Sequence, residues 1–244
     1  MRGYLYHNIV LVKSNLIAMG VFEALLFGAW TLFVVLREFS GDTAAAGDDM
    51  TGVAVIGGLI VLTSFLLMEL VSIDFFKSCE GTRWCSFAIS SPGSVEGYLG
   101  AKYKLLLGID LLILLLWLLT DTLLGAFCRE SLPLASVAFE CCCIQLILQA
   151  VEIAFAVRLG AAFGSYCKYI FLTLIGIAAL VYGLFGDISI FQQEDPLAAM
   201  TELVSSGGIL WVIALLPYAA LLIYGASYRY AVKVFRKGVE LYED

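Results

Sequence analysis

Residues 105–124, LLLGIDLLILLLWLLTDTLL, form an apolar run that only a few polar residues interrupt. A helix of this length rises about 30 Å at about 1.5 Å per residue, which matches the hydrocarbon thickness of a bilayer. Comparable runs recur along the chain, and they predict an all-α membrane protein in which residues 1–244 form one domain with six transmembrane helices. The six predicted spans are Leu16–Leu36, Val53–Val71, Leu105–Leu124, Leu134–Val157, Tyr169–Phe185 and Ile209–Tyr228. The first run is longer than the apolar region of a cleavable leader, so we expect it to remain a span.

The composition agrees with a lipid environment. Hydrophobic residues make up 61% of the chain and charged residues only 14%, against roughly a quarter in soluble domains. The net charge is -7 at pH 7, and no basic face is concentrated enough to follow a phosphate backbone. We therefore expect no nucleic-acid partner.

Positive charge is distributed unequally between the predicted loops. Of the 14 Lys and Arg residues, only Arg37 and Arg129 lie on one side of the six-span arrangement. Cytoplasmic loops of membrane proteins are enriched in Lys and Arg, so both termini are predicted to be cytoplasmic. The remaining basic residues lie on that side, in the N-terminal segment, the loops before the third and fifth spans, and the tail: Arg2, Lys13, Lys77, Arg83, Lys102, Lys104, Arg158, Lys168, Arg229, Lys233, Arg236 and Lys237.

Two polar segments flank the first spans. The start, MRGYLYHNIVLVK, places Leu5, Ile9 and Val12 on one helical face, which favours a short interfacial helix over an unstructured tail. The loop from Ser72 to Lys104 is long enough to hold structure outside the membrane.

The predicted spans also carry polar side chains. On each of spans three and four, three of them share one narrow face at helical spacing. A carboxylate at mid-membrane costs a few kcal/mol unless it is protonated, paired or facing a cavity. The two faces are either a translocation path or a set of structural interhelical hydrogen bonds. The candidate path residues are Asp110, Trp117 and Asp121 on the third span and Gln145, Gln149 and Glu152 on the fourth.

Several kinds of chemistry have no support in the sequence. No phosphate-binding glycine loop is present, so the chain itself is not expected to be an enzyme or to hold a cofactor. His7 is the only histidine, which argues against a catalytic triad or a histidine-ligated metal. The seven cysteines do not form a disulfide framework. Cys141, Cys142 and Cys143 point about 100° apart on a helix, so we expect small buried side chains and no metal site.

The loop after the second span carries a pattern with a known counterpart. An acidic residue, a Trp, a Pro-containing turn and a Lys-Tyr pair that enters the third span stand in a fixed order. With the short basic start and six spans, this chain resembles the ABC-2 type permease family, and most of all the small six-span bacterial permeases that export phenol-soluble modulins or antimicrobial peptides. The residues that carry the resemblance are Glu80, Trp84, Pro92, Lys102 and Tyr103.

The resemblance implies a multi-pass permease of the bacterial cell membrane that moves amphipathic or hydrophobic peptides out of the cell. A separate ABC ATPase subunit would bind ATP and Mg, and a second permease copy would complete a homodimer or a related heterodimer. A cytoplasmic coupling helix between spans two and three would dock on the ATPase through Lys77, Glu80, Arg83 and Trp84. Trp84 could instead be an interfacial belt residue.

Two other functions remain open on the sequence alone. The chain could be a proton-coupled secondary transporter that acts without an ATPase, or a membrane-anchoring or sensory subunit that transports nothing. Six spans without a visible internal repeat argue against the secondary transporter.

Overall fold

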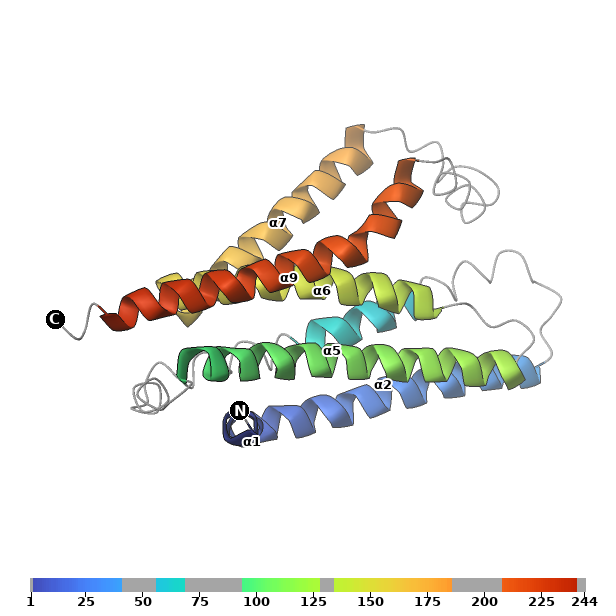
Figure 1. Ribbon diagram of the computed structural model, residues 1–244. Coiled ribbons are helices and arrows are strands. Elements are labelled where there is room, and N and C mark those ends of the chain that lie inside the picture. Colours follow the sequence, from blue (N-terminus) through green and yellow to red (C-terminus); the bar gives the residue numbers. More distant parts are fainter. Residues whose placement is uncertain (1, 41–55, 69–93, 128–133, 186–207, 241–244) are drawn as a thin grey trace.

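A computed structural model describes residues 2–40, 56–68, 94–127, 134–185 and 208–240 (Figure 1). Within these ranges the backbone is helical except at Val12 and Gly160. The helices are α1 (Arg2–Leu11), α2 (Lys13–Ser40), an unlabelled helix at Ile56–Met68, α5 (Ser94–Phe127), α6 (Leu134–Leu159), α7 (Ala161–Phe185) and α9 (Gly208–Glu240). The all-α prediction is therefore confirmed for the described residues.

Among the residues that the structure describes, three helices are long and apolar enough to cross a membrane: Lys13–Leu36, Val95–Ala126 and Leu134–Leu159. The Ile56–Met68 helix is apolar but shorter. Large apolar side chains such as Leu25, Leu115 and Leu174 lie on the outside of the bundle. Outward-facing leucines on long apolar helices are compatible with a membrane protein.

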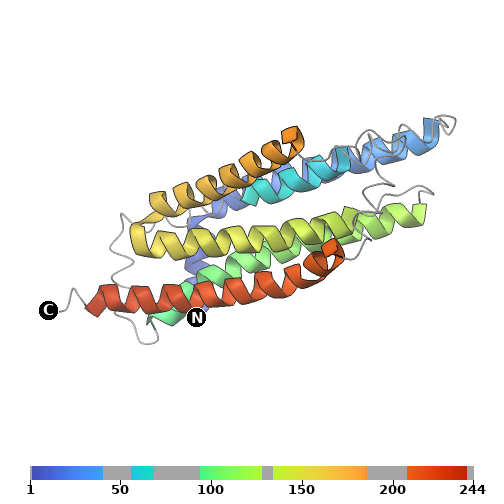
Figure 2. The same cartoon turned by 90° about the horizontal axis from the view of Figure 1, so that it is seen from above.

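Helix α6 lies in the middle of the bundle and packs against α5, α7 and α9 (Figures 1 and 2). Trp117 and Ile113 of α5 are fully buried, and Ile153 of α6 is nearly so. Helix α7 diverges from α6 along its length, as Figure 1 shows. The best-packed part of the bundle is thus the region where α5, α6, α9 and the first turns of α7 meet.

Four segments of the chain lie at one end of the bundle. Helix α1, the start of α5, the junction between α6 and α7, and the end of α9 all lie there (Figures 1 and 2). These are the segments that the charge distribution assigns to a common side. That this end faces the cytoplasm stays a prediction.

Helix α1 runs across the direction of the long helices (Figure 2). Helical hydrogen bonds continue through the bend, from Val12 N to Asn8 O (3.2 Å) and from Leu16 N to Val12 O (2.9 Å). The expected N-terminal helix is present. Asn8 and Val12 are buried while Ile9 is exposed, because α1 packs against α5.

Two helices begin earlier than the predicted spans, α5 at Ser94 and α7 at Ala161. Helix α5 begins at Ser94, so Lys102 and Tyr103 are buried within it instead of lying in a loop. The Lys102 ammonium lies 4.8 Å from the centre of the Tyr98 ring one turn earlier, an environment that helps to accommodate a buried cation. The predicted coupling residues, Lys77, Glu80, Arg83 and Trp84, lie outside the described residues.

Candidate functional site

Helices α6 and α7 form a hairpin with a one-residue connection at Gly160. The backbone φ of Gly160 is 98°, a conformation that favours glycine over residues with a side chain. Gly160 N donates to Ala156 O (2.9 Å), and Gly164 N donates to Gly160 O (3.1 Å). The chain therefore reverses direction without a loop.

Gly164 lets the two helices approach closely. A Cβ atom at this position would lie 2.7 Å from Glu152 O, 2.8 Å from Ala156 Cβ and 2.9 Å from Ala156 N. A small residue at a helix interface lets the two backbones approach closely, as Gly164 does here.

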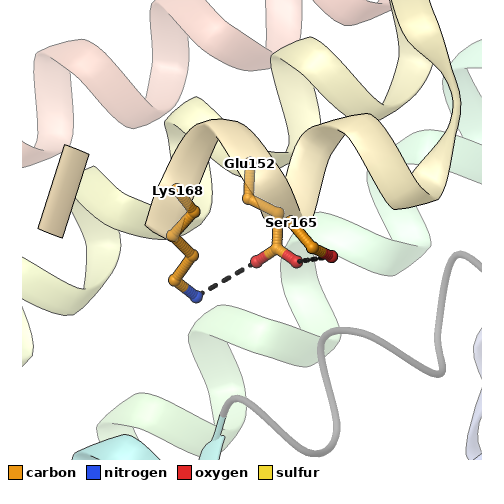
Figure 3. A network of polar contacts seen from close by, with 3 residues as sticks. All are labelled: Glu152, Ser165 and Lys168. Carbon is orange, nitrogen blue, oxygen red and sulfur yellow. Dashed lines mark hydrogen bonds and ion pairs between the residues drawn. The ribbon is translucent and has the colours of Figure 1, made fainter. Parts of the chain in front are cut away.

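The close hairpin brings a carboxylate and an ammonium together (Figure 3). Lys168 Nζ lies 3.1 Å from Glu152 Oε2. Ser165 Oγ donates a long hydrogen bond of 3.5 Å to Glu152 Oε1. Glu152 precedes Gly160 by about two helical turns and Lys168 follows it by the same interval, so the hairpin register places them opposite each other.

This ion pair lies almost entirely out of solvent, with 1% of the Lys168 side chain and 3% of the Glu152 side chain exposed. Burying two charges carries a desolvation penalty that can exceed their attraction. The presence of the pair therefore does not by itself indicate that it stabilises the fold. Removal of one partner leaves an uncompensated buried charge, at a cost of about 3–5 kcal/mol.

A third ionisable group lies beside the pair. Asp110 of α5 is fully buried, and its carboxylate interacts electrostatically with Gln149 of α6 and Lys168 of α7. Among the described residues, neither Asp110 oxygen makes a hydrogen bond of normal geometry, and neither do the side-chain amide atoms of Gln149. The Nε2 atom of buried Gln145 has no partner there either. Unsatisfied buried polar atoms are costly in a folded protein, so these atoms are candidates for a functional contact.

The other candidate path residues lie elsewhere. Trp117 is buried against Phe27 of α2, with ring centres 4.6 Å apart. Asp121 is half-buried at the end of α5 and accepts hydrogen bonds from Leu134 N (3.3 Å) and Ala135 N (3.4 Å) at the start of α6. Asp121 therefore caps the first turn of α6, as acidic residues often do.

A hydroxyl chain links α5, α6 and α9 next to the cluster. Ser227 Oγ donates to Ala150 O (2.6 Å), so the bond between Tyr103 and Ser227 (2.8 Å) has the tyrosine hydroxyl as donor. Tyr224 OH donates to Tyr103 O (2.8 Å). These bonds fix the positions of α6 and α9 relative to α5, the helix that carries Asp110.

The sequence interpretation identified Asp110, Gln149 and Glu152 but missed Lys168 and Ser165. It read both as part of a cytoplasmic loop, whereas they belong to the first turns of α7. The sequence does carry one signal for this pair, because Glu152 and Lys168 lie at equal distances along the chain from Gly160. Among the described residues, no group of three or more His, Cys, Asp or Glu side chains is placed to hold a metal ion.

No family model, curated protein or solved structure matches this chain. The site therefore rests on its own geometry: a buried ion pair and an adjacent buried carboxylate, surrounded by apolar helices.

Proposed function

We propose that this chain is the transmembrane permease of an ABC exporter, which moves amphipathic or hydrophobic peptides out of a bacterial cell with ATP hydrolysed by a separate subunit. The proposal draws on the buried cluster of Asp110, Glu152 and Lys168 in an apolar bundle. Ionisable residues at membrane depth are rare, and they commonly line substrate or ion pathways. In this proposal six spans cross the membrane, and both termini face the cytoplasm.

The motor in this proposal is a partner protein. The resemblance of the segment from Glu80 to Tyr103 to ABC-2 permeases supports coupling to an ATPase through Lys77, Glu80, Arg83 and Trp84. ATP and Mg would be bound by that partner, and two permease copies, identical or related, would enclose the path. A buried Trp with neighbouring charges is a common anchor in protein interfaces.

Co-purification with the ATP-binding protein encoded beside this chain tests the coupling. Trp84→Ala should reduce recovery of the ATPase, while Trp84→Phe, which keeps an aromatic ring, should retain more of it. Trp211→Ala is the matched control, because Trp211 is 72% exposed at the start of α9. Equal recovery with Trp84→Ala and Trp211→Ala would remove the anchoring role of Trp84.

Export of a labelled amphipathic peptide tests the path. Glu152→Gln should slow export, while Glu140→Gln, a half-buried acid on the same helix, should leave it near normal. If the two variants export equally well, Glu152 is structural.

One observation favours a second function. Asp110 is fully buried beside the amide of Gln149 and within reach of the charge of Lys168, and ionisable groups at membrane depth serve as proton sites in secondary transporters. Vesicles that contain only this chain distinguish the two functions. Peptide movement that follows a pH gradient without ATPase would favour the secondary transporter, and movement that requires the ATPase and ATP would favour the exporter.

A further inference from the structure

Basic side chains of α6 and α9 meet at the end of the bundle where α6 joins α7 (Figure 1). Arg158 is the next-to-last residue of α6, and its Nη1 atom donates a hydrogen bond to the Tyr230 hydroxyl of α9 (3.4 Å). Lys233 and Lys237 follow Tyr230 by three and seven residues, so they share its side of α9. All four side chains are exposed. We refer to Arg158, Tyr230, Lys233 and Lys237 as the basic patch.

The carboxylates that form ion pairs near the basic patch are engaged elsewhere. Glu96 of α5 binds Arg236 of α9. Arg236 follows Tyr230 by six residues, which places it about 120° around the helix from that tyrosine. Glu152 of α6 is buried in its ion pair with α7. Neither carboxylate therefore neutralises the basic patch.

The polar groups of the basic patch are hydrogen-bond donors. Tyr230 accepts an N–H of Arg158, which leaves the tyrosine O–H to donate to another group. Guanidinium and ammonium groups donate hydrogen bonds and accept none. A ligand that matches these donors and their positive charge is an anion that accepts hydrogen bonds. Phosphate oxygens match the planar fork of a guanidinium especially well.

Exposed apolar side chains adjoin the basic patch, toward the middle of the bundle. Phe155 precedes Arg158 by three residues on α6, and Ile223 precedes Tyr230 by seven residues on α9, so each lies on the same side of its helix as the patch. Each of these two apolar side chains is 40% exposed. Arg158 also lies at the end of Leu134–Leu159, a helix long and apolar enough to span a membrane. Basic side chains at the end of a span reach the level of the lipid headgroups.

We propose that the basic patch binds the headgroup phosphate of an acidic phospholipid, whose acyl chains lie along the exposed apolar side chains of α6 and α9. Arg158 and Lys233 attract the phosphate, and the Tyr230 hydroxyl donates to one of its oxygens. Clusters of basic residues beside a span are a common means of binding acidic lipids. A soluble anion would match the charges but would leave Phe155 and Ile223 without an apolar partner. One bound lipid would also hold the ends of α6 and α9 together.

This inference requires a chain that lies in a membrane but no particular cargo or ATPase. The test is native mass spectrometry of the purified full chain in a neutral detergent, titrated with phosphatidylglycerol. Arg158→Gln and Lys233→Gln should each weaken lipid binding by about fivefold, because each removes one positive charge near the phosphate. Tyr230→Phe should also weaken binding, because it removes a donor without changing the charge. Arg229→Gln is the matched control, since Arg229 is exposed on another side of α9 and its loss removes the same charge.

The control variant should bind phosphatidylglycerol as the wild type does. Phosphatidylcholine with the same acyl chains should bind the wild type more weakly, and inorganic phosphate should not displace the bound phosphatidylglycerol. Equal affinity for the two lipids would overturn the proposal. An equal loss of binding in Arg158→Gln and Arg229→Gln would also overturn it, because net charge alone would then attract the lipid. Displacement by inorganic phosphate would show a site for a soluble anion and would likewise contradict the proposal. Circular dichroism of each variant establishes that the helices are intact.

Discussion

Gly164→Ala offers a direct test of the α6–α7 hairpin. The added Cβ would lie 2.7 Å from Glu152 O, whereas ordinary van der Waals contact begins at 3.4 Å. The helices must therefore separate by about 0.7 Å at this point, because the obstructing atoms include backbone and cannot rotate away. Overpacking of this kind costs about 1–3 kcal/mol. The separation also lengthens the 3.1 Å contact between Lys168 and Glu152.

The measurement is unfolding by SDS titration in mixed micelles, followed by far-ultraviolet circular dichroism. Gly108→Ala on α5 and Gly225→Ala on α9 are matched controls, since a Cβ at either site meets nothing within 4 Å. Each control should be neutral or more stable by up to about 1 kcal/mol, because Ala favours helix more than Gly does. If Gly164→Ala unfolds at the same SDS fraction as the controls, the close hairpin described here is wrong.

Two further variants test other contacts by the same unfolding assay. Asp121→Ala should destabilise the chain by about 1 kcal/mol, because the first backbone N–H groups of α6 lose their acceptor. Thr122→Ala, at an exposed neighbouring position, is the control. Equal stability of the two variants would contradict the capping role of Asp121. Ser227→Ala should lower the free energy of unfolding by about 1–3 kcal/mol, because the buried Tyr103 hydroxyl and the Ala150 carbonyl lose the Ser227 hydroxyl as partner. Stability within a few tenths of a kcal/mol of the wild type would show that the hydroxyl chain contributes little.

The sequence predicts the existence and type of the helices better than their ends. The Leu134–Val157 prediction and α6 (Leu134–Leu159) begin at the same residue, because a proline at 133 and a long apolar run mark that start clearly. The starts of α5 and α7 were placed too late. In both cases the polar residues Lys102 and Lys168 belong to the first turns of a helix, whereas their charge favours a loop when the sequence is considered alone.

The buried cluster was predicted in part, for a physical reason. Helical spacing places Gln145, Gln149 and Glu152 on one face, and all three are buried in the structure. The pairing of Glu152 with Lys168 depends on how α6 and α7 are aligned in the hairpin. The periodicity of a single helix carries no information about that alignment. A lysine also favours a loop on composition alone, and only tertiary pairing stabilises it inside a bundle.

Two of the basic residues that predict the cytoplasmic side do not lie at a solvated surface. Lys102 and Lys168 are each 1% exposed and so do not contribute to a solvated basic surface. Arg158, Lys233 and Arg236 remain exposed on segments that lie at one end of the bundle.

The most direct test of the account is the sidedness of the chain in the membrane. Single cysteines at Ala45 and Glu80, in a variant without the seven native cysteines, are exposed to a membrane-impermeant thiol reagent in intact and in opened cells. The account predicts that position 45 is labelled in intact cells and that position 80 is labelled only after the cells are opened. Labelling of position 80 in intact cells would place the loop that contains Trp84 outside the cell, where no ATPase could drive it, and would contradict the proposed exporter.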